Sequence, residues 1–256
     1  MSAEHEKEYA LFNHIFSLPS EKLNAIRGKP ELVLSAIDDY QKNTETHYMD
    51  IGQAKGQIIV DKIREKKPKI MVELGGYLGY SAILFGKELL QDSTAHYYSL
   101  EANPTFAEMA TKLIDLAGIS EKVTILVGPA TTSLVSLQKE LQKQDSGVRT
   151  FDFVFIDHWK DLYVPDLRVM ESLNLIAPGT VLVADNIYHP GAPEYVKYIQ
   201  GTADSKREHN ASIPNANGHS FVGRWDIVYD SKTIPVELEN RRDAIELTYC
   251  TGYAEK

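Results

Sequence analysis

The spacing of hydrophobic residues along the chain changes near residue 69. Before that point, apolar residues recur at helical spacing over the first sixty-odd residues, with one helix predicted from Pro30 and another over 51–63. After it, short apolar runs alternate with longer amphipathic stretches. We interpret the short runs as strands: IMVEL (70–74), HYYSLE (96–101), KVTILVG (122–128), FDFVFID (151–157) and TVLVADN (180–186).

The stretches between these runs favour helices, at about 79–90, 104–117, 130–142, 161–175 and 193–200. Strands that alternate with helices predict a mostly parallel sheet with helices on both faces. The end of the chain differs, because FVGRWDIVYD (221–230) and AIELTYC (244–250) have no long helical pattern between them, which predicts an antiparallel C-terminal edge. The sequence therefore indicates a single α/β domain over 1–256, with N-terminal helices in 1–66, the α/β core in 67–256 and a long loop at about 202–220.

Composition narrows the class of protein. The chain has 256 residues, 43% of them hydrophobic and 25% charged, which is typical of a folded, soluble domain. The net charge of −9 disfavours nucleic-acid binding, which usually needs a basic face. One cysteine, Cys250, cannot form an intrachain disulfide, and neither a membrane-spanning run nor a signal peptide is evident. We expect a cytoplasmic monomer without a membrane or nucleic-acid partner.

Candidate chemistry lies where the predicted strands end, because ligands of open parallel sheets bind outside the carboxyl ends of the strands. The first strand leads into Glu73 and then Gly75, Gly76 and Gly79, a turn whose backbone can approach a ligand closely. A tight strand-to-helix turn without a ligand would look the same. The turn does not match the dinucleotide pattern G-x-G-x-x-G, because Tyr77 and Tyr80 stand where glycines are required.

A second carboxylate, Glu101, follows the next strand, where it could accept the hydroxyls of a ribose. It could equally be a charge at a helix N-terminus. Together with the glycine turn, it favours a nucleoside-containing ligand without a pyrophosphate.

Two later strands end in oxygen ligands, at Asp157 and at Asp185-Asn186. Two carboxylates and an amide suit Mg²⁺, whereas aspartates at helix N-caps are the alternative. Lys160 could reach the same cleft, although a lone lysine is more often a solvated surface charge. His158 is predicted to line a pocket, and Trp159 offers a flat apolar wall or belongs to the core.

With these residues in view, the sequence from about Pro30 to the C-terminus resembles the catechol O-methyltransferases. The resemblance rests on AIDDY, GQAKGQI, VELGGYLGYSA, FIDHWKDLYVPD, GTVLVADN and HPGAPEY. It implies a Rossmann-like class I methyltransferase fold, S-adenosylmethionine as methyl donor, Mg²⁺ as metal and a small-molecule catechol as the substrate.

The resemblance also implies residue roles. Asp157, Asp185 and Asn186 would bind the metal, Lys160 would be the general base, and Glu237, in VELEN, would bind the second catechol hydroxyl. Glu73, Gly75, Tyr77 and Ser81 would contact the methionine part of the donor, together with the backbone near Met49 and Ile51. Glu101 would hold the ribose, and His158 and Trp159 would flank the adenine and the active site.

The sequence departs from the family around this set. His47 replaces a gating tryptophan of the mammalian enzymes, and Ala130-Thr131 replaces a serine–glutamine pair near adenine. The segment 202–234 is longer than in the family, and we expect it to border the acceptor pocket because it immediately precedes Glu237. A methyltransferase of phenylpropanoid thioesters, a nicotinamide-dependent dehydrogenase and a silent nucleoside-binding protein are the alternatives. Tyr77 and Tyr80 disfavour the dehydrogenase, and the complete metal and lysine set disfavours the silent binder.

Overall fold

Five parallel strands occupy the centre of the computed structural model, which describes residues 5–144, 150–239 and 241–255. They are β1 (Ile70–Leu74), β2 (His96–Glu101), β3 (Val123–Val127), β4 (Phe153–Ile156) and β5 (Val181–Ala184). Two long strands, β6 (Ile227–Leu238) and β7 (Arg241–Tyr253), complete a seven-stranded sheet in the order β3-β2-β1-β4-β5-β7-β6. Because β7 runs antiparallel to β5 and to β6, the predicted α/β fold with a mostly parallel sheet and an antiparallel C-terminal edge is confirmed.

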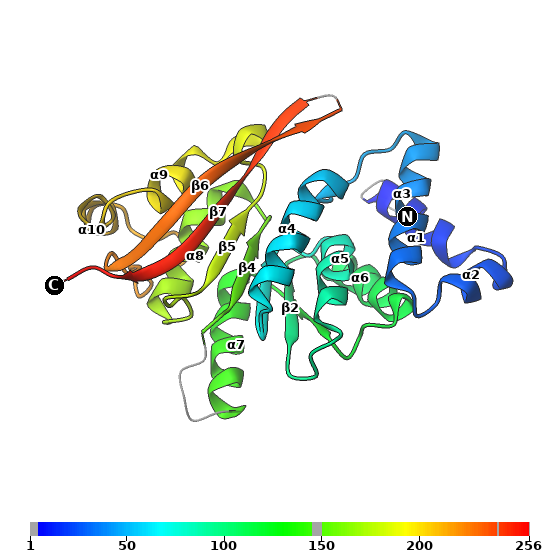
Figure 1. Ribbon diagram of the computed structural model, residues 1–256, viewed down its shortest axis with the longest axis horizontal. Coiled ribbons are helices and arrows are strands. Elements are labelled where there is room, and N and C mark those ends of the chain that lie inside the picture. The colour runs from blue at the N-terminus through cyan, green and yellow to red at the C-terminus, as the bar shows by residue number, and fades with distance from the viewer. Residues whose placement is uncertain (1–4, 145–149, 240, 256) are drawn as a thin grey trace.

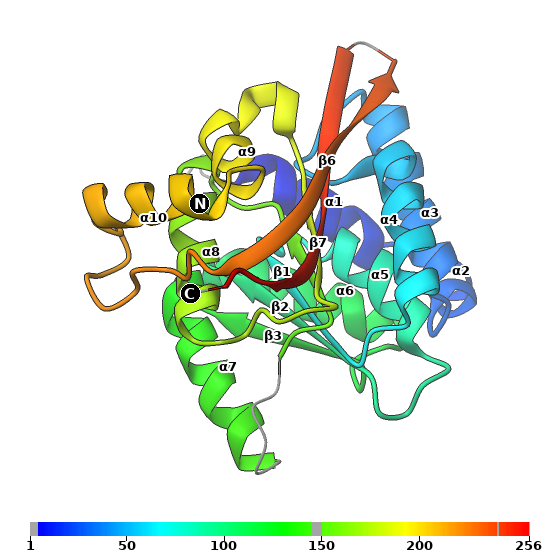
Figure 2. The same cartoon turned by 60° about the vertical axis from the view of Figure 1, so that its left-hand side comes forward.

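Helices cover both faces of this sheet (Figures 1 and 2). No helix in the described part of the chain is both long and apolar enough to cross a membrane. The helices and short helical turns are α1 (Glu6–Phe16), α2 (Ser20–Ile26), α3 (Pro30–Thr44), α4 (Gly52–Lys66), α5 (Tyr80–Gly86), η1 (Lys87–Leu89), α6 (Pro104–Ala117), α7 (Ala130–Gln144), η2 (Lys160–Leu162), α8 (Tyr163–Ser172), η3 (Ile187–Gly191), α9 (Pro193–Ile199) and α10 (Ala203–Ser212).

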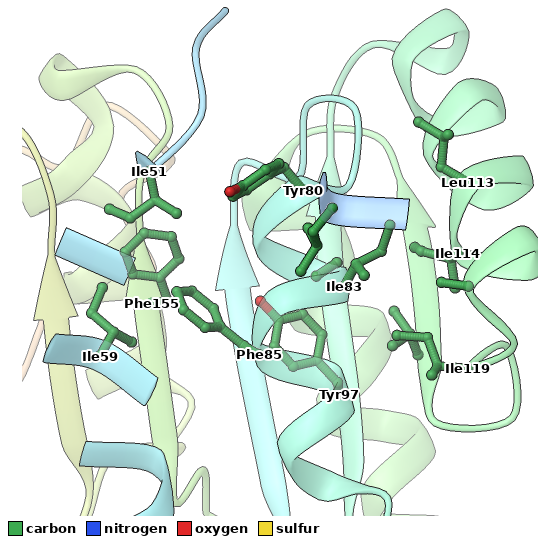
Figure 3. Close-up of a cluster of buried hydrophobic side chains, with 14 of the residues drawn as sticks. Ile51, Ile59, Tyr80, Ile83, Phe85, Tyr97, Leu113, Ile114, Ile119 and Phe155 are labelled. Carbon is green, nitrogen blue, oxygen red and sulfur yellow. The ribbon is translucent and has the colours of Figure 1, made fainter. Parts of the chain in front are cut away.

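The alternation of side chains along each strand creates two cores. Met71, for example, faces α1 and α3–α6, whereas its neighbour Val72 faces α7, α8 and α9. In the core that contains Met71, the rings of Phe85 and Phe155 meet edge to face with centroids 5.3 Å apart (Figure 3). Because both faces are buried, the parallel strands are continuously hydrophobic, which is why the sequence marks them so clearly.

The parallel register brings the carboxyl ends of the strands to one edge. Leu74 of β1 pairs with Leu100 of β2 on one side and with Ile156 of β4 on the other, and Ile156 pairs with Ala184 of β5. The chain order reverses between β1 and β4, so this edge contains the topological switch point. The residues after these strands therefore share one region.

Two expectations about the C-terminal part are wrong. Residues 201–220 are not all loop, because α10 spans Ala203–Ser212, capped by the Thr202 hydroxyl, which accepts from the Ser205 N–H. The C-terminal strands are also longer than predicted, since β6 continues to Leu238 and β7 begins at Arg241. The resulting hairpin extends beyond the ends of the parallel strands (Figures 1 and 2).

Candidate functional site

Glu73, near the end of β1, is a fully buried carboxylate. It accepts hydrogen bonds from the Ser99 hydroxyl at 2.6 Å and from the hydroxyl of Ser81 on α5. Burial raises the pKa of Glu73 from its ordinary 4.5 to about 7, against the two serine hydrogen bonds, which favour the charged form. Glu73 and Ser81, two of the predicted donor-binding residues, are thus brought together beneath the glycine turn.

The glycine turn fits closely against the end of β4. Gly75 has φ +97°, and a Cβ atom there would lie 2.6 Å from the carbonyl oxygen of Asp157 and 3.0 Å from Cα of His158. Only glycine satisfies both the backbone conformation and this close approach. Gly75 therefore brings the β1 turn against the segment that carries the predicted metal ligand.

Glu101, at the end of β2, accepts backbone hydrogen bonds through both carboxylate oxygens. The Tyr77 N–H donates to Oε2 and the Asn103 N–H donates to Oε1, each at 2.7 Å. Burial nevertheless raises the pKa of Glu101. Asn103 in turn caps α6 by accepting from the Thr105 N–H, so the chain turns into a helix directly beyond this carboxylate. The local structure joins the β1 turn to the β2 turn around Glu101.

The N-terminal helix α1 lies over this turn. The Tyr77 hydroxyl donates to the buried carboxylate of Glu8 at 2.5 Å, and the Lys7 ammonium donates to the His47 carbonyl oxygen at 3.1 Å. Of the other expected donor contacts, Ile51 is buried, whereas the Met49 side chain is 64% exposed. Sequence reasoning missed the part that α1 plays at this edge.

Lys160 and Asp157 meet at the end of β4. The Lys160 ammonium donates to Asp157 Oδ1 at 3.0 Å and to the Tyr163 hydroxyl at 2.6 Å, and that hydroxyl donates to the Asp185 carbonyl oxygen at 3.2 Å. Burial and then repulsion from Asp185 raise the pKa of Asp157 above its usual range. Lys160 therefore reaches Asp157, as their spacing predicts, and Tyr163 is an additional partner.

Asp185 is buried and is bound by a lysine that sequence reasoning missed. The ammonium of Lys55, on α4, donates to both carboxylate oxygens of Asp185 at 2.7 Å and to Asp243 Oδ2 at 3.0 Å. The amide of Asn186 donates to the same Asp243 oxygen at 3.2 Å. Burial opposes the charge of Asp243, but the Ala244 N–H and Lys55 hold the pKa of that carboxyl below its usual value.

His158 and Trp159 have different environments. The His158 ring is stacked on Tyr163, and its Nε2 lies 2.9 Å from Oδ2 of Asp166. Its buried Nδ1 has no hydrogen-bond partner among the described residues. Trp159 is 78% exposed, so it is not part of the core.

Glu237 does not join the cluster of Asp157, Lys160, Asp185 and Asn186 through any contact in the described part of the chain. Its carboxylate pairs with Arg242 Nε at 3.0 Å and is 77% exposed. The carboxylate that the β6–β7 hairpin delivers to the cluster is Asp243. The predicted role of Glu237 stays a prediction.

The cluster fits a hard divalent cation. Within residues 5–144, 150–239 and 241–255, no three His, Cys, Asp or Glu side chains form a metal-binding group of their own. The predicted set instead combines two carboxylates with an amide, all oxygen donors. Burial and then repulsion from Asp185 raise the pKa of Asp157, and a cation next to both carboxylates would favour its ionised form.

Comparisons with known proteins agree with this architecture. A family model described as O-methyltransferase matches residues 29–206. Bovine catechol O-methyltransferase is 36% identical over 206 residues, covering 80% of this chain and 71% of the bovine protein, and the mouse enzyme is 37% identical over 206 residues, covering 80% and 72%.

Solved structures show the same fold. A putative O-methyltransferase from Klebsiella pneumoniae has a TM-score of 0.61 at 22% identity, covering 95% of this chain and 97% of that one. An O-methyltransferase from Bacillus cereus has a TM-score of 0.57 at 17% identity, covering 95% and 96%. At these identities the likeness concerns the fold alone.

Glu73 generates a prediction about pH and stability. Because its pKa is higher in the folded protein than in the unfolded chain, the folded protein binds more protons between about pH 4.5 and 7, and stability falls as pH rises through this window. Glu73→Gln removes this titration, so its free energy of unfolding relative to wild type should rise from pH 5 to 8 by up to about 3 kcal/mol. Urea denaturation of both ligand-free proteins at each pH measures this difference in the free energy of unfolding.

A matched variant should move the same pH window upward. Ser99→Ala removes a hydrogen bond that favours the charged carboxylate, so the loss of stability should extend to higher pH than in wild type. Parallel stability profiles for wild type and Glu73→Gln would contradict the assignment.

Proposed function

Because the chain belongs to the catechol O-methyltransferase family, as its motifs predict, we propose that it methylates one hydroxyl of a catechol. In this proposal S-adenosylmethionine is the methyl donor, Mg²⁺ is the metal and Lys160 is the general base. That it is an O-methyltransferase follows from the family; the donor, metal, acceptor and base are the proposal. The observation that carries it is the position of Lys160 Nζ, which lies 3.0 Å from Asp157 Oδ1 and 2.6 Å from the Tyr163 hydroxyl, a group that itself donates to the carbonyl oxygen of the buried Asp185.

The β1 and β2 turns supply the charges that a sulfonium nucleoside requires. The buried Glu73 carboxylate suits the ammonium of the methionine part, because a cation there would favour its ionised form. Glu101 suits the ribose, since each of its oxygens retains a lone pair beyond the one that accepts a backbone N–H. The Bacillus cereus relative was solved with S-adenosylhomocysteine, the demethylated donor, which supports the same ligand class here.

Asp157, Asp185 and Asn186 would hold Mg²⁺ through their side-chain oxygens. When bound, the ion supplies a Lewis acid that lowers the pKa of a chelated hydroxyl and fixes both hydroxyls of the catechol. The residues of the chain then have to receive one proton and orient the nucleophilic oxygen.

Lys160 is held in a geometry suited to receiving that proton. A neutral amine has two N–H donors and one lone pair, and Asp157 and Tyr163 provide acceptors for both donors. The lone pair is then left to accept the proton from the catechol hydroxyl. The oxygen forms its bond to the methyl carbon, and the carbon–sulfur electron pair leaves with the sulfur, which yields a methyl ether and a neutral thioether.

Exposed apolar side chains beside the site suit an aromatic acceptor. Trp159 follows the Asp157 strand end, Tyr188 follows Asn186, and Met49 precedes α4; they are 78%, 48% and 64% exposed. His47, where the mammalian enzymes have a tryptophan, lies on the same segment as Met49, so selectivity among catechols should differ from theirs. Glu237 remains a candidate for the second hydroxyl, and an approach to the site would require it to release Arg242.

Product formation tests the proposed reaction. Purified protein with S-adenosylmethionine and Mg²⁺ should methylate catechols but not matched monophenols, and a chelator should abolish the product, as measured by mass spectrometry. The panel includes a dihydroxylated phenylpropanoid thioester and its free acid. Preference for the thioester would replace the catechol assignment, and methylation of monophenols in the presence of chelator would contradict metal chelation.

Lys160→Met tests the general base separately from the metal. We expect kcat to fall by about 10²–10⁴-fold with donor binding unchanged, because the proton acceptor is lost while the turns around Glu73 and Glu101 remain. Mn²⁺ binding should be no weaker than in wild type, since a cation beside Asp157 is removed. Lys112→Met, at an exposed lysine paired with Glu108, is the control. An unchanged kcat across pH would exclude Lys160 as the base.

A further inference from the structure

Asp243 is a buried carboxylate that reaches the site from the C-terminal hairpin. β7 runs antiparallel to β5, with Ala184 paired to Glu246, so the residues before Glu246 continue past the end of β5. Asp243 therefore lies beside Asp185 and Asn186, and its side chain has no exposed surface. Nothing in the reaction described above uses it.

The two oxygens of Asp243 have separate sets of partners. Oδ1 accepts three backbone N–H groups, from Tyr188 at 3.2 Å, His189 at 3.1 Å and Ala244 at 2.8 Å. Oδ2 accepts the Lys55 ammonium at 3.0 Å and the Asn186 amide at 3.2 Å. The backbone thus fixes the carboxylate, and among the described residues Oδ2 accepts only from the side chains of Lys55 and Asn186.

This arrangement selects the orientation of the Asn186 amide. A carboxylate only accepts hydrogen bonds, so it pairs with the NH₂ group of Asn186 and leaves the amide oxygen for another partner. The amide oxygen is the atom that a hard cation requires. A reversed amide would set two acceptors against each other and turn the NH₂ group toward the cation.

Lys55 extends the same control to Asp185. Its ammonium lies 2.7 Å from both oxygens of Asp185 and 3.0 Å from Asp243, and all three side chains are buried. A donor shared by both oxygens fixes the plane of the Asp185 carboxylate, while each oxygen keeps a lone pair for a cation. Asp243 in turn fixes the lysine.

We propose that Asp243 is the positioning residue of the metal site, which orients the Asn186 amide directly and the Asp185 carboxylate through Lys55. The inference rests on the proposed function, because it concerns how the proposed ligands are held. Asp243 itself need not touch metal or substrate.

Asp243→Asn tests this role with almost no change in size. The three backbone N–H groups keep the amide oxygen of the new side chain at the Oδ1 position, so its NH₂ group must face both Lys55 and the NH₂ of Asn186. Two donors then face each other, and Asn186 is driven to turn its oxygen away from the metal position. We expect Mn²⁺ to bind about 10–100-fold more weakly, as measured by electron paramagnetic resonance without donor or catechol.

A compensating substitution separates orientation from charge. Asn186→Asp combined with Asp243→Asn keeps the net charge, restores a donor–acceptor pair of reversed polarity, and gives position 186 two equivalent oxygens that need no orientation. Mn²⁺ affinity should return to within about threefold of wild type. Failure of the double variant to recover, with its fold intact, would contradict the orienting role.

Glu246→Gln is the matched control on the same strand. Glu246 is equally buried and accepts from Gln200, Ser231 and Thr233 on the other face of β7, so its variant should bind Mn²⁺ as wild type does. Binding of S-adenosylhomocysteine and thermal unfolding report on the fold of each variant. Asp243→Asn with wild-type Mn²⁺ affinity overturns the inference, whereas a wild-type protein that binds no Mn²⁺ overturns the proposed metal site itself.

A measurement on the wild-type protein follows the Asn186 amide directly and needs a variant only to assign its resonances. The side-chain NH₂ resonances of Asn186, assigned from their absence in Asn186→Asp, should show slow exchange with solvent both before and after Mg²⁺ is added, since they stay bonded to Asp243. A change to fast exchange on adding Mg²⁺ would show that the amide turns, and it would overturn the inference.

Discussion

The compensation of buried charge at the carboxyl edge of the sheet is the constraint on which the site depends. Asp157, Asp185 and Asp243 bring three carboxylates together, and Lys55 and Lys160 are the cations that contact them. Burying such charges is unfavourable unless each is paired and hydrogen-bonded. The pairs found here meet that requirement only in part, because the pKa of Asp157 is still raised by burial and by Asp185. A cation bound at this edge would offset the repulsion between Asp157 and Asp185 and favour the ionised form of Asp157.

The fold supplies this arrangement by combining two kinds of strand pairing. Parallel pairing aligns the ends of β1, β4 and β5, which places Gly75, Asp157 and Asp185 at one edge. The antiparallel strand β7 then passes the end of β5 and adds Asp243 from the opposite chain direction. Helix α4 contributes Lys55 from one face of the sheet. The contacts among Lys55, Asp185, Asn186 and Asp243 therefore depend on α4, the end of β5 and β7, so a defect in the C-terminal hairpin should reach the proposed metal ligands.

The sequence predicts the features that local periodicity encodes. The five parallel strands and most of the helices follow from hydrophobic runs and spacing, and the candidate residues follow from the rule that ligands bind at strand ends. The pairing of Lys160 with Asp157 is a local, three-residue relation and was accessible in the same way. The α10 helix was missed because its polar, turn-rich surroundings outweighed a helix with little apolar character.

The contacts that were missed are non-local. Lys55 is separated by 130 residues from Asp185 and by 188 from Asp243, so no spacing rule relates them. One signal was present: Lys55 lies four residues after Ile51 and four before Ile59, on the apolar face of its helix, where a lysine needs a buried partner. For the hairpin, the family pattern directed attention to Glu237, whereas Asp243 is the carboxylate that contacts the cluster.

In the proposed reaction, the strand-end residues hold a cation to which both hydroxyls of the acceptor bind. The most direct measurement is the electron paramagnetic resonance linewidth of Mn²⁺-loaded protein with catechol labelled with ¹⁷O at one or at both hydroxyls. We expect broadening by either single label and greater broadening by the double label. Unchanged linewidths, at concentrations where catechol binding is independently shown, would mean that the acceptor does not bind the metal and would exclude chelation of the catechol.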